Sequence, residues 1–338
     1  MTIHMNAKVV AFGTTAVIIA IVIAVVLVPY ETFHEGHRPS DIFREWTELE
    51  RQGRQVYFEN ACYNCHSQYI RSVDWGLGAE RLAQPGDYHQ QTPPLLGSIR
   101  TGPDLSQEGG EHTDDWHEAH FHNPRFTRPE SIMPKFGFLS AQQTRALIAY
   151  VQSLGYKDAD ARVRRQLEWR AEAIAAYERG EDENIEWLFS HVPQGWLEVP
   201  SPYPATEVGL LRGATIYQRF CIGCHGAVGD GQGPAAPFIY PPPLNFTTLK
   251  RHPKASGGMI YYQIMNGVTG TAMPYFKREL ESEKIWDVGN YVAKYFINNL
   301  DADGEPAGID AAYEPAPEFH DNEAGSDGRH PAAATGGG

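Results

Sequence analysis

Two five-residue stretches constrain this chain more than any other feature. They read CYNCH at residues 62–66 and CIGCH at residues 221–225. The pattern C-x-x-C-H is the attachment signature of a c-type haem, in which both cysteines form thioethers and the histidine becomes an axial iron ligand. The sequence therefore predicts two covalently bound haem c groups, with these attachment residues and proximal ligands: Cys62, Cys65, His66, Cys221, Cys224 and His225.

Two other interpretations of the cysteines are weaker. A four-cysteine zinc ribbon places its two pairs about 15–20 residues apart, whereas Cys65 and Cys221 are 156 positions apart (221 − 65). A thioredoxin-like C-x-x-C needs no histidine directly after it, and here both motifs have one. The four cysteines of the chain are all used by the two motifs.

The N-terminal region contains an apolar run long enough to cross a bilayer. Val9–Val28 is twenty residues without a charge, and at 1.5 Å per residue it matches a hydrocarbon core of about 30 Å. A cleaved signal peptide has a shorter apolar core and a small-residue cleavage site, which is missing after Val28. We expect a retained anchor over residues 1–39, on the bacterial cytoplasmic membrane, with the rest of the chain on the periplasmic side.

Residues 40–156 have the frame of a small class I cytochrome c. Ser40 or Asp41 is expected to cap a helix that leads to Cys62, and Ser140 to cap a second helix over residues 141–154. Such a domain needs a second axial ligand between the helices, and Met133 is its only methionine. A His/Met pair raises the haem potential. A gap-filling core methionine is the alternative.

Several histidines compete with Met133 for this role, and most of them are expected to be surface or hydrogen-bonding residues. They are His89, His112, His117, His120 and His122. A proline carbonyl from Pro103 is expected to accept a hydrogen bond from His66 and so orient its ring.

At these residues the chain resembles the mono-haem subunit (subunit II) of cbb3-type cytochrome c oxidases. The resemblance covers residues 1–156 and is carried by CYNCHSQ (62–68), IR (70–71), GSxRTGPDL (97–105), DWHxAH (115–120), NPR (123–125) and PESxMP (129–134). It implies a membrane complex in which this subunit passes electrons to a haem–copper catalytic subunit that carries haem b. It ends near residue 156, where a subunit of that family normally stops.

The remainder divides into three parts. Residues 157–205 form a helical and aromatic connector, with an expected helix at 158–179 broken by residues 180–183, and are expected to pack on a domain or a neighbouring subunit. Residues 206–300 repeat the cytochrome plan, with Met273 as the second axial ligand and Pro242 as the orienting proline. Met259 and Met265 are rivals that look like core positions. Residues 301–338 are an acidic, disordered tail.

The sequence thus predicts a mainly α protein with one N-terminal transmembrane helix and two class I cytochrome c domains. It is expected to be a non-catalytic subunit that takes electrons from a soluble or membrane donor, a cytochrome or a copper protein, through the C-terminal haem and then the N-terminal haem. The net charge of −14 argues against a nucleic-acid partner. Two alternatives stay open: a c-type subunit of a nitric oxide reductase-like complex, and a free membrane-tethered di-haem shuttle.

Overall fold

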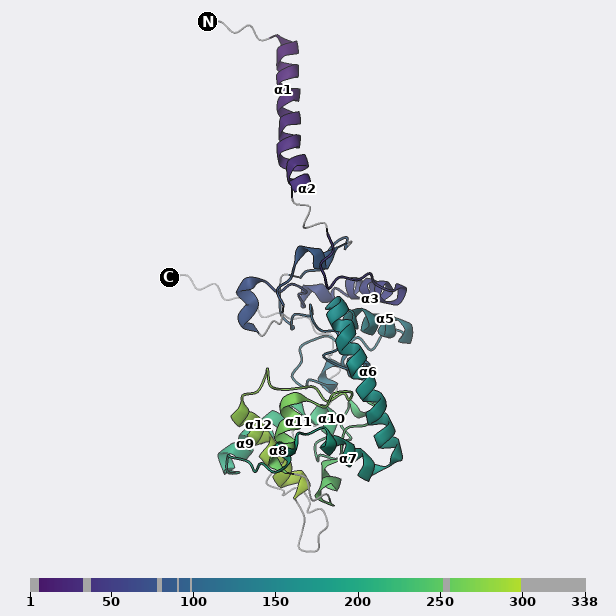
Figure 1. The fold of residues 1–338 in the computed structure, drawn as a ribbon, viewed down its shortest axis with the longest axis vertical. Coiled ribbons are helices and arrows are strands. Elements are labelled where there is room, and N and C mark those ends of the chain that lie inside the picture. The colour runs from purple at the N-terminus through teal and green to yellow at the C-terminus, as the bar shows by residue number, and fades with distance from the viewer. Residues whose placement is uncertain are drawn as a thin grey trace, which may run out of the picture.

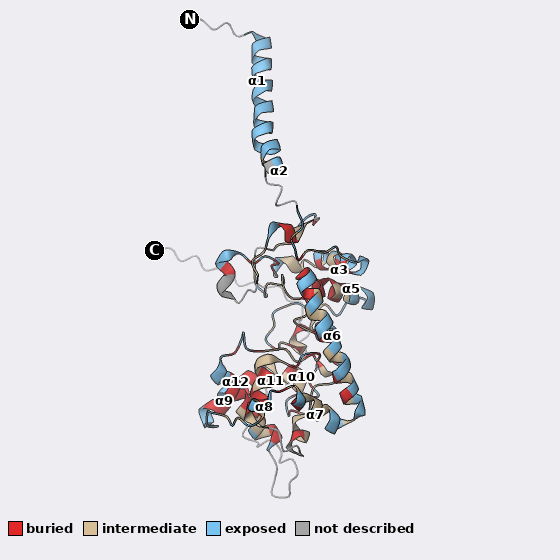
Figure 2. Cartoon of the chain, viewed as in Figure 1, coloured by how far each residue is buried: buried red, intermediate tan, exposed pale blue. Residues whose placement is uncertain are grey.

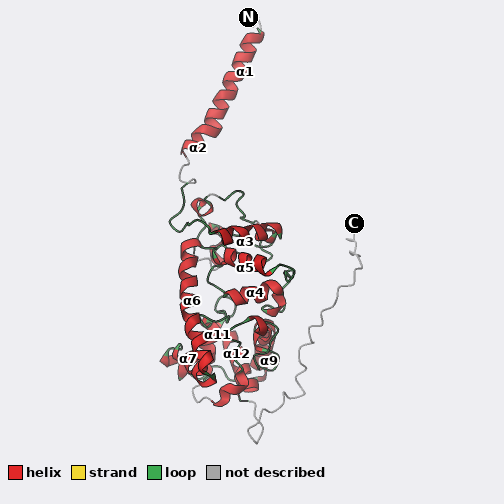
Figure 3. Cartoon of the chain, turned by 90° about the vertical axis from the view of Figure 1, so that its right-hand side faces the viewer, coloured by secondary structure: helices red, strands yellow, loops and turns green. Residues whose placement is uncertain are grey.

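The structure is a computed structural model, and its described part is helical, with no strand in it (Figure 3). The described residues are 6–32, 38–77, 81–89, 91–97, 99–251 and 256–298. The mainly α fold class predicted from the sequence is confirmed. The predicted acidic tail, residues 301–338, lies outside the described residues.

A single apolar helix leaves the body of the protein at the N-terminal end (Figure 1). It consists of α1 (Ala7–Val22), a π-helical stretch (Ile23–Leu27) and α2 (Val28–Thr32). The stretch Ala7–Glu31 has a mean hydropathy of 2.9 over its most apolar window, and none of that window is buried in the protein (Figure 2). An apolar helix of this length with no protein partner suits a single-pass membrane anchor.

The first domain is built on the crossing of two helices, α3 (Glu48–Glu59) and α5 (Ala141–Gln152). The crossing is close because Gly53 has no side chain: a Cβ there would lie 1.8 Å from the carbonyl oxygen of Ala146. Tyr57 and Tyr150 are fully buried beside it, with ring centroids 5.3 Å apart.

Both helices begin with a capping box, but the sequence predicted only one of the two N-cap residues correctly. Ser140 caps α5 as expected, in a reciprocal capping box with Gln143. The prediction that Ser40 or Asp41 caps the first helix was wrong, because α3 begins seven residues later in a capping box between Thr47 and Glu50. Residues 40–46 form a turn and an extended segment instead.

Shorter elements lie between these two helices. They are the 3₁₀ turns Cys62–Asn64, Ser72–Leu77, Pro85–Tyr88 and Pro124–Phe126, and the helix α4 (Asp114–His122). Of these, the Cys62–Asn64 turn and α4 line the first cavity together with α3 and α5.

The connector is folded and joins the two domains. Its long helix α6 (Tyr156–Arg179) runs beside both of them (Figure 1) and is followed by α7 (Glu181–Ser190) and α8 (Gln194–Leu197). The break is Gly180 alone, with φ of 135°, and the acidic residues after it start α7, where their charge favours the helix N-terminus. Phe189 is buried in the core of the second domain, so the connector packs on a domain, one of the two expected outcomes.

The second domain repeats the frame of the first. Helices α9 (Glu207–Phe220) and α12 (Ser282–Val292) cross at Gly213, where a Cβ would lie 2.3 Å from the carbonyl oxygen of Asp287. Tyr217 and Tyr291 take the places of the first tyrosine pair, at 5.6 Å. The other elements are α10 (Ile222–His225), α11 (Gly257–Asn266), a closing π-helical turn (Ala293–Ile297), and the 3₁₀ turns Ala236–Phe238 and Phe246–Arg251.

Candidate haem sites

The first motif follows directly from the end of α3. Ala61 turns the chain in the left-handed region, with φ of 54°, and the motif then forms a tight 3₁₀ turn. The Nδ1 atom of His66 lies 2.9 Å from the carbonyl oxygen of Pro103, the partner expected from the sequence. Gly102 permits this approach, because a Cβ there would lie 2.3 Å from the imidazole ring. The contact fixes the ring and leaves Nε2 as the nitrogen that can bind a metal.

The loop that carries Pro103 is held by a charged network. Asp74 lies 2.9 Å from the guanidinium groups of both Arg71 and Arg100, and these hydrogen bonds hold the pKa of Asp74 well below its usual range. The Nε of Arg100 donates to the hydroxyl of Ser67 at 2.6 Å, and that hydroxyl donates to Asp104 at 2.5 Å. The network ties the motif to the 100–104 turn. Of its members, the resemblance motifs contain Arg71, Arg100, Ser67 and Asp104, whereas Asp74 was not identified from the sequence.

Met133 lines the same cavity as the first motif. The cavity has a volume of about 1460 Å³, and Met133 projects from a turn in which the backbone N–H of Met133 donates to the hydroxyl of Ser131 at 3.2 Å. Its place across from His66 in one cavity agrees with an axial role, and that role stays a prediction.

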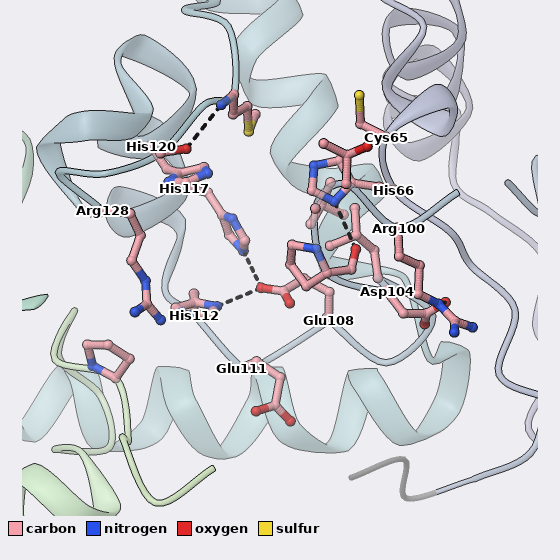
Figure 4. A pocket seen from close by; sticks show the side chains of 18 of the residues that line it. Cys65, His66, Arg100, Asp104, Glu108, Glu111, His112, His117, His120 and Arg128 are labelled. Carbon is pink, nitrogen blue, oxygen red and sulfur yellow. Dashed lines mark hydrogen bonds and ion pairs between the residues drawn. The ribbon is translucent and has the colours of Figure 1, made fainter. Parts of the chain in front are cut away.

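Two histidines that were expected at the surface or in hydrogen bonds line this cavity. His112 is hydrogen-bonded, as expected, whereas His117 is only 2 % exposed and its Nε2 has no hydrogen-bond partner among the described residues. They meet the carboxylate of Glu108 (Figure 4), which the sequence analysis did not consider. Because a loop separates Glu108 from the two histidines, this contact is hard to predict from the sequence.

The second motif forms the short helix α10. Here the orienting carbonyl differs from the prediction: the Nδ1 atom of His225 lies 3.2 Å from the carbonyl oxygen of Leu244, and not from that of Pro242. The chain passes through three consecutive prolines, residues 241–243, and the acceptor comes just after them. Burial lowers the pKa of His225 to about 4, so the ring is neutral at pH 7 and can ligate a metal.

Met273 lines the second cavity with Cys221, Cys224 and His225. The backbone N–H of Met273 donates to the hydroxyl of Thr271 at 3.3 Å, which repeats the contact of Met133 with Ser131. Met259, in α11, is buried in the hydrophobic core but also lines the second cavity, so it stays a rival of Met273. The second cavity is narrower, about 120 Å³, and its walls are mostly apolar.

The donor set fits haem c at both places. Each cavity is lined by the two motif cysteines, by the motif histidine with its Nδ1 next to a carbonyl oxygen, and by methionine: Met133 in the first, Met259 and Met273 in the second. The two cysteine pairs line different cavities, which excludes a zinc site made from all four. Burial raises the pKa of Cys62 to about 11 and that of Cys221 and Cys224 to about 12, so these are neutral thiols rather than thiolate ligands at pH 7.

The two cavities share part of one wall. Phe220 and Pro274 line both of them. Phe220 directly precedes Cys221, and Pro274 directly follows Met273, so the wall of the second site is also a wall of the first.

The two domains are docked closely around this wall. Gly223, inside the second motif, lies against the first domain, since a Cβ there would be 2.0 Å from the carbonyl oxygen of Phe126. The guanidinium of Arg128 donates to Glu279 at 2.6 Å, and the hydroxyl of Tyr275 donates to Glu111 at 2.6 Å. Backbone and side-chain contacts therefore both link the second domain to the first.

Comparisons with known proteins agree with this division. Residues 2–146 match the family described as Cytochrome C oxidase, mono-heme subunit/FixO. Residues 209–292 match the family described as Cytochrome C oxidase, cbb3-type, subunit III. Both families are components of an oxidoreductase complex.

Two individual proteins show weaker similarity. A thiosulfate dehydrogenase of Thiomonas intermedia (strain K12) is 26% identical over 147 residues, which are 40% of this chain and 42% of that protein. The chain thus spans about two fifths of that relative. A chain of the Kuenenia stuttgartiensis reducing HAO-like protein complex is 22% identical, covering 75% of this chain and 98% of that one, with a TM-score of 0.26, too low to support an argument.

The helical fold, the two C-x-x-C-H motifs and the two family matches therefore show that one polypeptide joins a region of the mono-haem FixO family, residues 2–146, to a region of the cbb3-type subunit III family, residues 209–292.

Proposed function

We propose that this chain is the di-haem electron-transfer subunit of a membrane-bound cbb3-type haem–copper oxygen reductase. It receives electrons from a donor at the C-terminal haem, passes them to the N-terminal haem, and delivers them to a catalytic subunit that carries haem b. The haems supply the one-electron chemistry, and the protein supplies attachment, orientation and the path between them.

The shared wall is the observation that carries this proposal. Of the described residues, only Phe220 and Pro274 are common to the linings of the two cavities, and each adjoins a predicted haem-binding residue, Cys221 or Met273. Haems held in these two cavities would be separated by single side chains rather than by solvent. Such an arrangement would give one polypeptide a continuous route for electrons.

The order of the route follows from the position of the anchor. The apolar helix leads into the first domain, and the second domain lies on the far side of it (Figure 1). A catalytic subunit in the membrane would meet the first domain, which leaves the second domain accessible to a donor. The bulk of the chain would then lie in the periplasm, where haem c is attached in bacteria.

Purification of the full-length chain in mild detergent tests the proposal. We expect two haem c groups per chain, haem b in the same fractions, and oxygen uptake that cyanide abolishes. Haem b and non-haem iron with nitric oxide consumption would favour a nitric oxide reductase-like complex instead. Haem c alone, with no partner chain, would leave a membrane-tethered shuttle and refute the proposal.

The position of the wall has its own test. Gly223→Ala would place a methyl group against the Phe126 carbonyl and separate the domains, whereas both haem sites keep their ligands. We expect slower reduction of the N-terminal haem after rapid mixing with a reductant that reacts at the C-terminal haem. Gly195→Ala is the control, because a Cβ at Gly195 meets no atom within 4 Å. An unchanged rate in Gly223→Ala would argue against the direct route.

A second candidate follows from the similarity to a thiosulfate dehydrogenase. In that case the chain itself would oxidise a sulfur oxyanion, and the cationic side chains around the first cavity, among them Arg100, Arg128 and Arg219, would bind the anion. Anaerobic addition of thiosulfate to the oxidised protein distinguishes the two. Reduction of the haems within a catalytic timescale would support this candidate, and unreduced haems would exclude it.

A further inference from the structure

Three side chains in the wall of the first cavity form a compact group with the chemistry of metal ligands. We use the name triad for Glu108, His112 and His117. Their ligand atoms all lie within 4.8 Å of one another. The Nδ1 atom of His112 is 2.6 Å from Oε1 of Glu108, and Nε2 of His117 is 3.8 Å from the same oxygen (Figure 4).

Within the triad, His117 has an unused nitrogen in a buried place. The residue is 2 % exposed, and its Nε2 atom has no hydrogen-bond partner among the described residues. A buried polar atom without a partner destabilises the folded protein. A group bound at Nε2 would remove that destabilisation.

The second domain shows that packing alone does not require a histidine here. The backbone N–H of Phe136 donates to the carbonyl of Phe121 in α4, and that of Phe276 donates to the carbonyl of Ile264 in α11. These matching bonds set the register of the two helices. Four residues earlier, His117 in α4 corresponds to Ile260 in α11 (121 − 4 and 264 − 4), and Ile260 is also buried. The same frame thus accepts an ordinary hydrophobic residue at this position.

The charge of the triad suits a cation. Burial would raise the pKa of Glu108, but the interaction with His112 outweighs it, so the pKa is lowered and the carboxylate is ionised. Burial lowers the pKa of His117 to about 4, so its ring is neutral and Nε2 carries a lone pair. Two imidazoles and one carboxylate are a ligand set that zinc uses in proteins.

We propose that Glu108, His112 and His117 bind a divalent transition-metal ion, with Zn²⁺ the best match, in the wall of the first cavity. Bonds of about 2.0–2.2 Å in a tetrahedral site hold ligand atoms roughly 3.3–3.6 Å apart, so the present separations, none above 4.8 Å, need to change by at most about 1.5 Å. The fourth position faces the cavity and is open to water.

Hydrogen bonds to neighbouring segments fix the loop that carries Glu108. The backbone N–H of Gly109 donates to the carbonyl of Leu154, and Nε of Arg162 donates to the carbonyl of Gly109, at 2.9 and 2.7 Å. The ion would join this loop to α4. The site uses none of the predicted haem ligands, and the proposal does not depend on the partner or on the direction of electron flow.

Equilibrium dialysis of the haem-loaded full-length protein against Zn²⁺, with metal content measured by mass spectrometry, tests the site. We expect one tightly bound zinc per chain. Glu108→Gln keeps the size of the side chain but removes its charge, and is expected to weaken binding at least about tenfold. His122→Gln is the control, since His122 lies on the same helix and is exposed.

A second variant copies the other domain. His117→Ile is expected to retain both haems and lose the zinc. If it does not fold, Glu108→Gln decides the question alone. Zinc binding that is equal in Glu108→Gln and in the unaltered protein would overturn the proposal.

X-ray absorption at the zinc edge identifies the ligands. Nitrogen and oxygen neighbours at about 2.0–2.2 Å, with imidazole scattering, are expected. Sulfur at about 2.3 Å would place the ion on cysteines of an unloaded haem motif, and would also overturn the proposal.

Discussion

The two cytochrome domains share a frame but differ in what lines it. Each has a glycine at the helix crossing, a buried tyrosine pair, and a methionine whose N–H is bonded to a hydroxyl two residues earlier. The first cavity has the larger volume and is lined by the triad, whereas the second is smaller and mostly apolar. The frame therefore holds the haem ligands, and the side chains of the α4 or α11 wall are free to provide a further function.

The largest effect is expected at Met133 and Met273, which take equivalent places in the two domains. Met133→His and Met273→His should each lower the midpoint potential of one haem, by on the order of 0.1 V within the ~0.8 V that axial ligands span. Spectroelectrochemical titration of the full chain measures both potentials.

Met259→Leu tests the rival ligand in the second domain, because Met259 is buried and also lines the second cavity. A shift in Met259→Leu without one in Met273→His would show that the second ligand has been assigned wrongly.

The glycines at the helix crossings give the next largest effect. Gly53→Ala and Gly213→Ala would each force a methyl group against a backbone carbonyl, and overpacking of this kind typically costs about 1–3 kcal/mol. Because the clash is shorter at Gly53, the first domain should lose more stability than the second. Thermal unfolding followed by circular dichroism tests this, with Gly195→Ala as the reference; equal losses would mean that the two crossings relax in the same way.

Acid should destabilise the first domain through Asp74. Its pKa is depressed in the folded state from an ordinary value of 3.8, so its contribution to stability is present above about pH 4 and is lost as the pH falls below that value. Asp74→Asn should lower the melting temperature at pH 7 and reduce the further drop at pH 3. A variant that melts like the unaltered protein at pH 7 would contradict the assigned role of the network.

The smallest effect is expected at the ion pair between the domains. The side chains of Arg128 and Glu279 are 27% and 39% exposed, and partly exposed pairs contribute at most about 1 kcal/mol. Glu279→Gln should therefore change the unfolding midpoint slightly, and high salt should remove the difference. A large loss would mean that the pair determines the docking more than the backbone contact at Gly223 does.

The features that could be predicted from the sequence are those with a local cause. The haem motifs, the Met-Pro turns and the Ser140 cap each depend on a few neighbouring residues. The start of α3 was missed although the Thr47–Glu50 capping box is readable, because the aromatic residues before it suggested that the helix began earlier. Those residues are partly buried by tertiary packing instead: Phe43 and Trp46 both contact the ring of Tyr156.

The features that could not be predicted depend on loops. The triad joins residues nine positions apart (117 − 108) across Gly109 and Gly110, and neither periodicity nor spacing indicates that they meet. The acceptor for His225 is displaced by two residues, from Pro242 to Leu244, because three prolines fix the path of the chain. The contact between Gly223 and Phe126 is a property of two domains and has no local signal.

The number of residues in helix α6 determines how the two domains are rotated relative to each other. Its buried residues include Ala159 near the first domain and Ala173 and Ala176 near the second, on one continuous helix. Each residue added to it would turn the second domain by about 100° and move it about 1.5 Å, whereas seven residues, close to two turns, would nearly restore the orientation at a distance of about 10 Å. The length of α6 therefore sets the orientation and the distance between the two haem sites more than its surface residues do. Insertions of one to seven residues would vary the angle and the distance separately.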